Sequence, residues 1–271
     1  MHSNNKEGNK VGRLNKAIYG TRQGGNRWHA KLDQAFHQMG FTRSKVNSYL
    51  YLYIKGSIKV YVPVYVDDQL MACNSRTHLD KVKLELSQHF KMKDMGPVKY
   101  IVGLEIHRDR SRRILHINKH KYALDVLKRF NMKNCKPVST PLEPGCHLSK
   151  DLCSQSQEDI EAMRSIPYLT AVGSLNYLAI GTRPDIVHAV GELGQFNSNL
   201  GLGHWTAVQH VLKYLKGTTD LELIYGPSES GSQEILQAYC DANYAEDEDR
   251  RRSTTGYAFF IGGVAVCWSS K

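Results

Sequence analysis

The spacing of apolar residues along the chain switches between helical and strand-like periods, and each switch predicts an element. In residues 26–39 apolar side chains recur every three or four positions, which predicts an amphipathic helix. Residues 48–54 and 58–66 are rich in Tyr, Val, Ile and Leu, which predicts two strands. The second strand runs into Asp67 and Asp68 before the apolar pattern resumes. The sequence therefore predicts a strand, a tight acidic turn and a further strand.

The rest of the chain alternates between the same two periods. The expected elements are a helix over 76–90, a hairpin of 100–106 and 114–117, a helix from Asn118 to Phe130, helices near 159–164, 168–180, 184–199 and 204–216, and strands over 221–225, 235–244, 254–262 and 264–268. Residues 1–12 are expected to form a disordered leader. Residues 134–158 contain several prolines, which predicts a linker. The fold class is α+β.

The first half of the chain is basic and the second half is acidic. The net charge is +10, but residues 1–75 carry 11 Lys and Arg against 4 Asp and Glu, residues 76–136 carry 16 against 6, and residues 137–271 carry 9 against 16. A basic first half suggests a polyanionic partner such as nucleic acid. The alternative is that solvated lysines only aid solubility.

Composition narrows the class of protein further. The six cysteines are scattered without a C-x-x-C pair, so zinc-ribbon and redox spacings are absent. No apolar run reaches the roughly 18 residues needed to span a bilayer. The polar start has no signal-peptide core. We expect no membrane partner and a cytoplasmic or nuclear rather than secreted protein.

The two adjacent carboxylates are the sharpest chemical feature. Asp67 and Asp68 follow a strand that is expected to be buried, so they need cation partners. Hard oxygen ligands suit Mg²⁺, and two such ions can serve nucleotidyl transfer. Taken alone, however, such a pair is more often an ordinary turn.

The residues around this turn carry a resemblance to a known family. Tyr65-Val66-Asp67-Asp68 resembles the Y-x-D-D box of reverse transcriptases. Further motifs follow in the order of the copia-type retrotransposon family: Lys16-Ala17-Ile18-Tyr19-Gly20-Thr21-Arg22-Gln23 with Trp28, Gly103-Leu104-Glu105-Ile106, Lys121-Tyr122-Ala123-Leu124, Ser139-Thr140-Pro141-Leu142, Gly173-Ser174-Leu175-Asn176-Tyr177-Leu178, Thr182-Arg183-Pro184-Asp185-Ile186, His204-Trp205 and Leu212-Lys213-Tyr214-Leu215-Lys216-Gly217-Thr218. Many separate motifs in one order make the resemblance specific, and it covers about residues 13–271.

The resemblance implies a fragment of a Pol polyprotein with RNA-directed DNA polymerase and RNase H lineage. The fold would be a partial right-hand polymerase palm with helical thumb and connection regions, followed by a truncated RNase H-like β-sheet. The implied divisions are a partial palm and thumb over 13–133, the linker over 134–158, a helical connection over 159–233 and the truncated RNase H-like domain over 234–271. The implied partners are an RNA or DNA template-primer and other parts of the polyprotein.

The resemblance also assigns roles to residues. Asp67 and Asp68 would be catalytic ligands of Mg²⁺, with Asp67 the more direct. Residues that would contact nucleotide or nucleic acid are Tyr19, Gln23, Arg27 and Tyr65. Packing is the alternative for Tyr19 and Trp28.

A second, weaker site follows from the same resemblance. Tyr239-Cys240-Asp241-Ala242-Asn243 resembles the first RNase H strand, so Asp241 would be a catalytic metal ligand. The neighbouring acidic run 246–249 is expected to be a solvated loop.

Several departures from the family limit these expectations. The family has another essential Asp upstream of the first motif, and no Asp precedes Tyr19 here. Asp241 stands without the later carboxylates, and its three strands are expected to have an exposed edge and apolar face. Pro63 is unusual in a central strand. Gly24-Gly25-Asn26 and Thr21 also depart from the family pattern. We therefore expect a catalytically incomplete chain, and the alternative is a nucleic-acid-binding module or remnant without catalysis.

Overall fold

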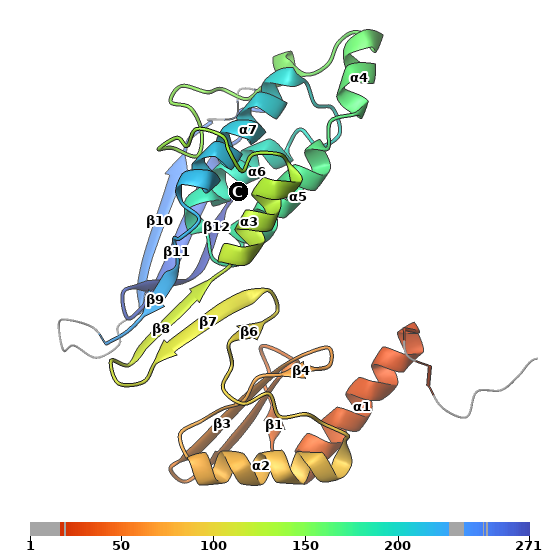
Figure 1. Ribbon diagram of the computed structural model, residues 1–271, viewed down its shortest axis with the longest axis vertical. Coiled ribbons are helices and arrows are strands. Elements are labelled where there is room, and N and C mark those ends of the chain that lie inside the picture. The colour runs from red at the N-terminus through yellow and green to blue at the C-terminus, as the bar shows by residue number, and fades with distance from the viewer. Residues whose placement is uncertain (1–16, 19, 228–235, 246, 248) are drawn as a thin grey trace, which may run out of the picture. The chain divides into compact units, whose positions relative to one another are not determined.

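The computed structural model describes residues 17, 18, 20–227, 236–245, 247 and 249–271 (Figure 1). The expected leader at 1–12 and Tyr19 lie outside the described residues. The fold is mixed α and β with antiparallel sheets, as the sequence predicts. None of the described helices combines the length and apolar character that crossing a bilayer requires.

The chain divides into two compact units, residues 1–98 and 99–271. The boundary therefore falls after Val98, between the expected helix over 76–90 and the expected hairpin. The expected linker at 134–158 lies inside the second unit instead of between two units.

The first unit is a five-stranded antiparallel sheet with two helices. The strand order is β1-β2-β3-β4, and β5 also pairs with β3. Its elements are α1 (Arg22–Gln38), β1 (Thr42–Arg43), β2 (Leu50–Lys55), β3 (Ile58–Tyr65), β4 (Asp68–Gln69), β5 (Ala72–Cys73) and α2 (Arg76–His89).

Helix α1 begins at Arg22, four residues earlier than the apolar spacing predicts. The Thr21 side chain accepts a hydrogen bond from the Gly24 N–H at 3.0 Å, which caps the first turn. A Cβ on Gly24 would lie 2.5 Å from the Ile18 carbonyl oxygen. The glycine therefore permits the close approach of this capped turn, so this departure from the family pattern has a local structural reason.

The core of the first unit follows the alternation of β3. Val60, Val62 and Val64 are buried, whereas the intervening side chains are exposed. The buried face packs with residues of both helices, among them Leu32, Ala35, Phe36, Val82, Leu86 and Phe90. The opposite face of the sheet carries the exposed side chains of β3.

A buried tyrosine ties α1 to this sheet. The Tyr51 hydroxyl donates a hydrogen bond to Asp33 at 2.9 Å, and Arg43 donates another at 3.3 Å. Burial and the bond to Asp33 raise the pKa of Tyr51 to about 12. Burial pulls the pKa of Asp33 upward, but the hydrogen bonds from Tyr51 and Arg43 outweigh it, so the pKa of Asp33 is lowered.

The second unit combines a helical body with two antiparallel sheets. The strand orders are β6-β7-β8-β9 and β10-β11-β12. Its elements are β6 (Tyr100–Ile101), β7 (Leu104–Asp109), β8 (Ile114–Asn118), α3 (His120–Arg129), η1 (Lys150–Leu152), α4 (Gln157–Arg164), α5 (Tyr168–Ala179), η2 (Pro184–Ile186), α6 (Val187–Gly194), α7 (Leu202–Gly217), β9 (Leu223–Tyr225), β10 (Gln237–Asn243), β11 (Thr254–Ile261) and β12 (Val264–Ser270).

The helical body matches the predicted helices except at some of their ends. The expected helix over 184–199 is the short η2 followed by α6, which stops at Gly194. Helix α3 begins at His120, two residues later than expected, and its N-cap is Lys119 and not Asn118. The Asn118 side-chain oxygen accepts a hydrogen bond from the His120 N–H at 3.1 Å. Buried residues of α3, α5, α6 and α7 form one continuous core.

Residues 134–158 are mostly irregular, as the prolines predict, but they are packed against this body. Leu142 and Leu148 contact its core. The His210 ring lies 3.1 Å from the Thr140 carbonyl oxygen. The buried His204 bridges the Ser149 carbonyl oxygen and the Gly201 N–H. This segment therefore belongs to the fold of the second unit and does not behave as a free tether.

The three-stranded sheet β10-β11-β12 is partly covered. The expected exposed edge is confirmed at β10, where every residue is exposed. The expectation of an exposed apolar face is wrong at β12, which contacts helices of the second unit. Trp268 donates a hydrogen bond to the Ala179 carbonyl oxygen of α5 at 2.9 Å, and Ala265 is buried.

Candidate functional site

The acidic turn lies at the tip of the β3–β4 hairpin in the first unit. Tyr65 pairs with Asp68, so the two residues between them, Val66 and Asp67, form the turn. Asp68 is therefore the first residue of the returning strand and not a turn residue. Both aspartates are exposed. Neither carboxylate has a hydrogen-bond or ion-pair partner among the described residues.

The backbone of this turn is unusual for its sequence. Val66 has φ +54°, whereas Asp67 keeps a negative φ. A positive φ at the first turn residue alone is the pattern of a type II′ turn, in which glycine is the usual first residue. A β-branched residue in this region is strained.

A tryptophan of α1 touches the same turn. The Trp28 indole N–H donates a hydrogen bond to the Val66 carbonyl oxygen at 3.2 Å. Its ring packs edge-on against Phe90, with centroids 5.0 Å apart. The structure shows Trp28 in packing contacts, which was the alternative stated for this residue, but sequence reasoning missed the bond to Val66. The available signal was that Trp28 and the acidic box belong to the same set of family motifs.

Pro63 divides the strand that follows the turn. The further strand that is expected after the acidic turn is two short strands, β4 and β5, which pair with β3 in one continuous register. The gap falls opposite Pro63, whose carbonyl accepts from the Leu70 N–H at 3.1 Å. The reciprocal bond cannot form because proline has no N–H. The unusual proline therefore interrupts the ladder next to the acidic tip.

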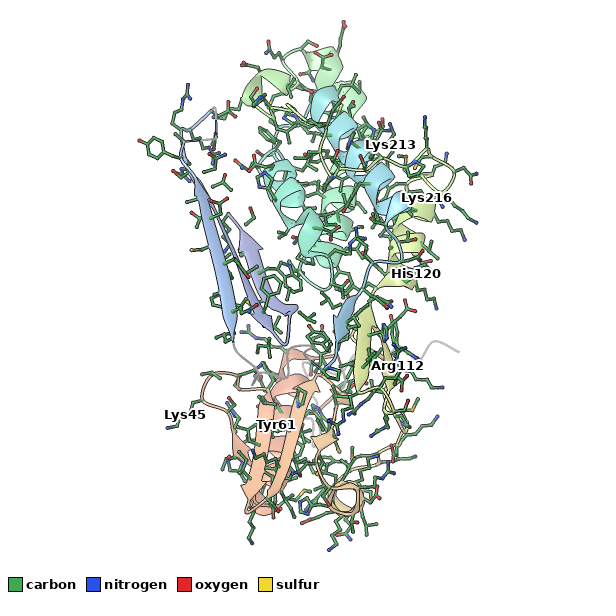
Figure 2. The ribbon with its side chains drawn as sticks, turned by 90° about the vertical axis from the view of Figure 1, so that its left-hand side faces the viewer. Lys45, Tyr61, Arg112, His120, Lys213 and Lys216 are labelled. Carbon is green, nitrogen blue, oxygen red and sulfur yellow. The ribbon has the colours of Figure 1, made fainter. Side chains whose placement is uncertain are left out.

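The open face of the sheet leads to the two aspartates. Tyr65 lies directly opposite Asp68 in the antiparallel pairing, so both side chains share one face. Tyr61 and Pro63 continue this face along β3. Figure 2 looks onto this face of the sheet, with Tyr61 labelled. Exposure of aromatic side chains beside the carboxylates is the main physical character of the site.

The other expected contact residues lie on α1 or outside the described part of the chain. Gln23 and Arg27 are exposed on the first turns of α1. No hydrogen bond or ion pair joins either side chain to Asp67 or Asp68 within the described residues. Tyr19 cannot be placed because it falls outside them.

Asp241 stands on β10 in the second unit. It pairs with Gly256, it is exposed, and its carboxylate accepts a hydrogen bond from the Ala242 N–H at 2.9 Å. Across the part of the chain that the structure describes, no group of three or more His, Cys, Asp or Glu side chains is arranged to hold a metal ion. Each candidate site thus offers one or two carboxylates.

The acidic run near Asp241 differs in part from the expected solvated loop. Asp249 is half-buried and accepts hydrogen bonds from the Lys150 N–H at 2.9 and 3.1 Å. Asp247 accepts bonds from the Asp249 and Arg250 N–H groups, each at 2.9 Å. These two carboxylates organise loops, and residues 246 and 248 lie outside the described residues.

Unlike the exposed aspartates of the acidic turn, a cluster of polar side chains in the second unit is buried and hydrogen-bonded. Arg183 is 3% exposed and makes a fork of hydrogen bonds to Asp185 and to Thr218. Lys119 is 5% exposed, lies over the Tyr177 ring, and donates to the Tyr177 carbonyl oxygen at 2.8 Å. Burial lowers the pKa of Lys119 to about 8.

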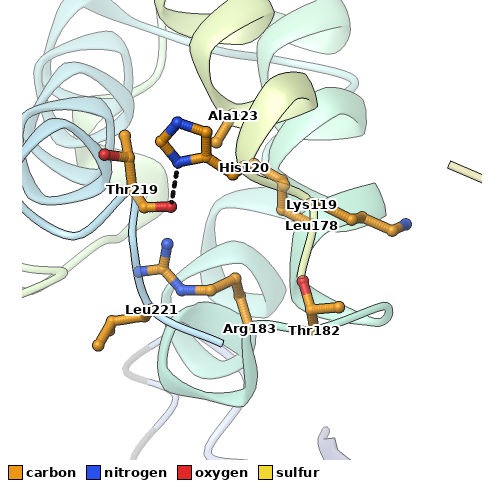
Figure 3. Close-up of a pocket in the computed structure, with 8 residues that line it drawn as sticks. All are labelled: Lys119, His120, Ala123, Leu178, Thr182, Arg183, Thr219 and Leu221. Carbon is orange, nitrogen blue, oxygen red and sulfur yellow. Dashed lines mark hydrogen bonds between the residues drawn. The ribbon is translucent and has the colours of Figure 1, made fainter. Parts of the chain in front are cut away.

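This cluster surrounds a hollow that leaves no space for a water molecule (Figure 3). The dashed line in Figure 3 joins His120 to the Thr219 carbonyl oxygen at 3.0 Å. The Thr182-Arg183-Pro184-Asp185 motif therefore tightens the packing between α5 and the end of α7. The motif thus contributes to the packing of the second unit.

Comparison with known proteins agrees with these motifs. Residues 2–144 match the family model described as reverse transcriptase (RNA-dependent DNA polymerase). The chain is 42% identical over 96% of its length to the retrovirus-related Pol polyprotein from transposon TNT 1-94 of Nicotiana tabacum, and 37% identical over 97% to that from transposon RE1 of Arabidopsis thaliana. It is also 37% identical, over 78% of its length, to the uncharacterized mitochondrial protein AtMg00810 of Arabidopsis thaliana, covering 83% of that protein.

The chain corresponds to only a small part of each polyprotein. The chain spans 19% and 17% of the length of the two polyproteins. No solved structure matches the chain. The chain belongs to the reverse transcriptase family found in the Pol polyproteins of copia-type retrotransposons.

Proposed function

We propose that this chain is the part of an RNA-directed DNA polymerase that carries the Y-x-D-D hairpin. Asp67 and Asp68 would bind Mg²⁺, and Tyr65 would face the primer end. The observation that carries the proposal is the placement of two exposed carboxylates, without protein partners among the described residues, at the tip of a hairpin beside an open sheet face. The fold itself does not use either carboxylate in a hydrogen bond within the described residues, so both oxygens of each are open to a cation.

The donor set suits magnesium in kind but is small in number. Carboxylate oxygens are the hard ligands that Mg²⁺ prefers, and the ion keeps water and substrate phosphates as its remaining ligands. When bound, such ions supply charge stabilisation for the attacking and leaving oxygens in nucleotidyl transfer. The described residues offer Asp67 and Asp68 alone at this turn. We infer that further carboxylates come from another part of the polyprotein, and that this chain alone does not extend a primer.

The template-primer is the proposed partner of the open face. Exposed tyrosines offer flat surfaces to bases, and base–aromatic stacking contributes about 1–3 kcal/mol per base. Tyr61 and Tyr65 are 42% and 59% exposed on this face. Gln23 and Arg27 on α1, with Tyr19, would contact the incoming nucleotide and template.

A basic surface on the second unit supports the same partner. Lys213 and Lys216 of α7 and Arg112 of the β7–β8 loop point outward on one side of this unit (Figure 2). Lysine and arginine contacts to phosphates release counterions, so binding through such a surface weakens as salt increases. Such a surface would hold a polyanion without reading its base sequence.

We assign the second unit to the thumb, connection and RNase H-like parts of the same enzyme. In this proposal Asp241 is a metal ligand of an RNase H-like site. It is a single exposed carboxylate on an edge strand. Such chemistry uses several carboxylates, so Asp241 alone would not support hydrolysis.

Primer extension and binding on one oligonucleotide template-primer test the proposal together. We expect salt-sensitive binding by the whole chain and no Mg²⁺-dependent extension. Extension that is lost in Asp67→Asn would show that the carboxylate set is complete and overturn the proposed incompleteness. Binding that is the same with and without Mg²⁺, and unchanged in Asp67→Asn, would favour a nucleic-acid-binding module without catalysis. Absence of binding at low salt would reject both.

A further inference from the structure

We propose that Trp28 is a positioning residue that sets the direction of the Asp67 carboxylate by holding the Val66 carbonyl. The inference rests on the proposed metal-binding role of Asp67. It assigns a task to a side chain that does not itself reach the metal or the substrate.

The geometry of the turn makes the Val66 carbonyl the decisive atom. Turn types I′ and II′ have similar ends but opposite orientations of the central peptide plane. Here the central peptide joins Val66 to Asp67. Its rotation would turn the Val66 carbonyl around and shift φ of Asp67 toward positive values. The direction of this carbonyl therefore selects between two placements of the Asp67 side chain.

Trp28 is placed to make that selection. Its indole N–H donates to the Val66 oxygen at 3.2 Å. Its ring is fixed from the other side by Phe90, which follows α2. A donor held by packing on a second helix cannot follow the carbonyl if the peptide rotates, so rotation would break the bond. The strained Val66, at φ +54°, is thus held in place by a contact from outside the hairpin.

The second unit contains another hairpin turn in which an aromatic side chain donates a hydrogen bond to the carbonyl of a valine with positive φ. The β6–β7 turn consists of Val102 and Gly103, with φ +50° and +73°, which is the pattern of a type I′ turn. The Val102 carbonyl oxygen accepts a hydrogen bond from the Tyr177 hydroxyl at 3.0 Å. Each of these turns therefore has a valine with positive φ whose carbonyl is bound by an aromatic donor on a helix.

Removal of the indole N–H tests the proposal by a signature that loss of stability alone would not produce. In Trp28→Phe we expect the central peptide to rotate in part of the molecules. The two N–H groups of Val66 and Asp67 are far apart in a type II′ turn and close together in a type I′ turn, so the Overhauser contact between them should strengthen. A lost hydrogen bond corresponds to a change of about tenfold in the ratio of the two turn forms.

Two matched controls remove the same kind of donor elsewhere. Trp268→Phe deletes an indole bond to the Ala179 carbonyl, and Tyr177→Phe deletes the hydroxyl bond to Val102. Neither should change the Val66–Asp67 contacts. Replacement of Trp28 by 3-benzothienylalanine keeps the ring size and packing but has no N–H, so it tests the bond even if Trp28→Phe disturbs the fold.

The outcomes separate this inference from the proposed function. Unchanged Val66–Asp67 contacts in the folded benzothienylalanine protein would overturn the positioning role. Paramagnetic broadening of the Asp67 and Asp68 amide signals by Mn²⁺ tests metal binding. We expect broadening in the wild type that weakens several-fold when the Trp28 N–H is removed. Absence of broadening in the wild type would overturn the metal site, and the turn contacts would still decide the role of Trp28.

Discussion

Two hairpin turns in this chain have the same backbone feature but differ in whether the carboxylates that follow them are hydrogen-bonded. The turns at Val66 and at Val102 both place a valine at positive φ and bind its carbonyl with an aromatic donor. Beyond Val102 the following polar residue is paired, because the Glu105 carboxylate accepts from the Lys121 N–H at 2.6 Å. Beyond Val66 the aspartates have no partner among the described residues. Similar turns are thus followed by a hydrogen-bonded carboxylate in the second unit and by carboxylates without a described partner in the first.

Motif residues of this family therefore fall into two kinds, those that are buried and hydrogen-bonded and those that are exposed without a described partner. Arg183 and His204 belong to motifs shared with the family, yet each is buried and hydrogen-bonded. Buried polar groups of this kind specify packing and are costly to remove. Asp67 and Asp68 cost the fold little to replace. Stability measurements should therefore sort the motif residues into two groups.

The largest expected effect is at Gly103 in the second unit. An added Cβ would meet the Tyr177 hydroxyl oxygen at 2.3 Å, and the positive φ adds strain. Gly103→Ala should lower the free energy of unfolding by about 3 kcal/mol, from backbone strain and the lost bond to Val102. Gly173→Ala is the control, because it lies on helix α5 with open space around it and should stabilise by about 0.5–1 kcal/mol. Equal effects in chemical denaturation would contradict the interpretation of the Gly103 turn.

A smaller effect is expected from acid in the first unit. The pKa of Asp33 is lower in the folded protein, so its contribution is complete above the unfolded pKa of about 4 and is lost as pH falls through the folded value. Because the carboxylate is partly exposed, the contribution should be at most about 1 kcal/mol. The protection factors of the α1 amides, which correct for the slower intrinsic exchange in acid, should fall between pH 5 and 3 in the wild type. Asp33→Asn should remove most of this dependence, and an unchanged slope would argue against the Asp33–Tyr51 link.

The smallest expected effect is at the acidic turn itself. Asp67→Asn and Asp68→Asn remove repelling exposed charges that no described group satisfies. The free energy of unfolding should change by less than about 0.5 kcal/mol, with any change toward greater stability. Thermal unfolding of each variant measures this. A loss comparable to that of Gly103→Ala would mean that the carboxylates are structural, and would remove the contrast between the two turns.

Local patterns in the sequence were enough to predict most elements, including the acidic hairpin and the helical body. These patterns failed where a hydrogen bond or a close contact outside the apolar period decides the outcome. The start of α1 depends on the Thr21 cap and on the approach of Gly24 to Ile18. The packing of 134–158 depends on contacts with α7, which no local period records. The bond from Trp28 to Val66 spans 38 residues and is visible only in three dimensions.

The missing N–H of Pro63 has a mechanical consequence for the acidic tip. Only the pairs Val64–Gln69 and Tyr65–Asp68 join β3 to β4 beyond the gap in the ladder. The Leu70 carbonyl at that gap has no ladder donor from Pro63, so the tip is coupled to the rest of the sheet by fewer bonds than an unbroken hairpin would have. The orientation of the tip relative to the sheet therefore depends on few contacts. The main ones are the two remaining residue pairs and the hydrogen bond from Trp28 to Val66.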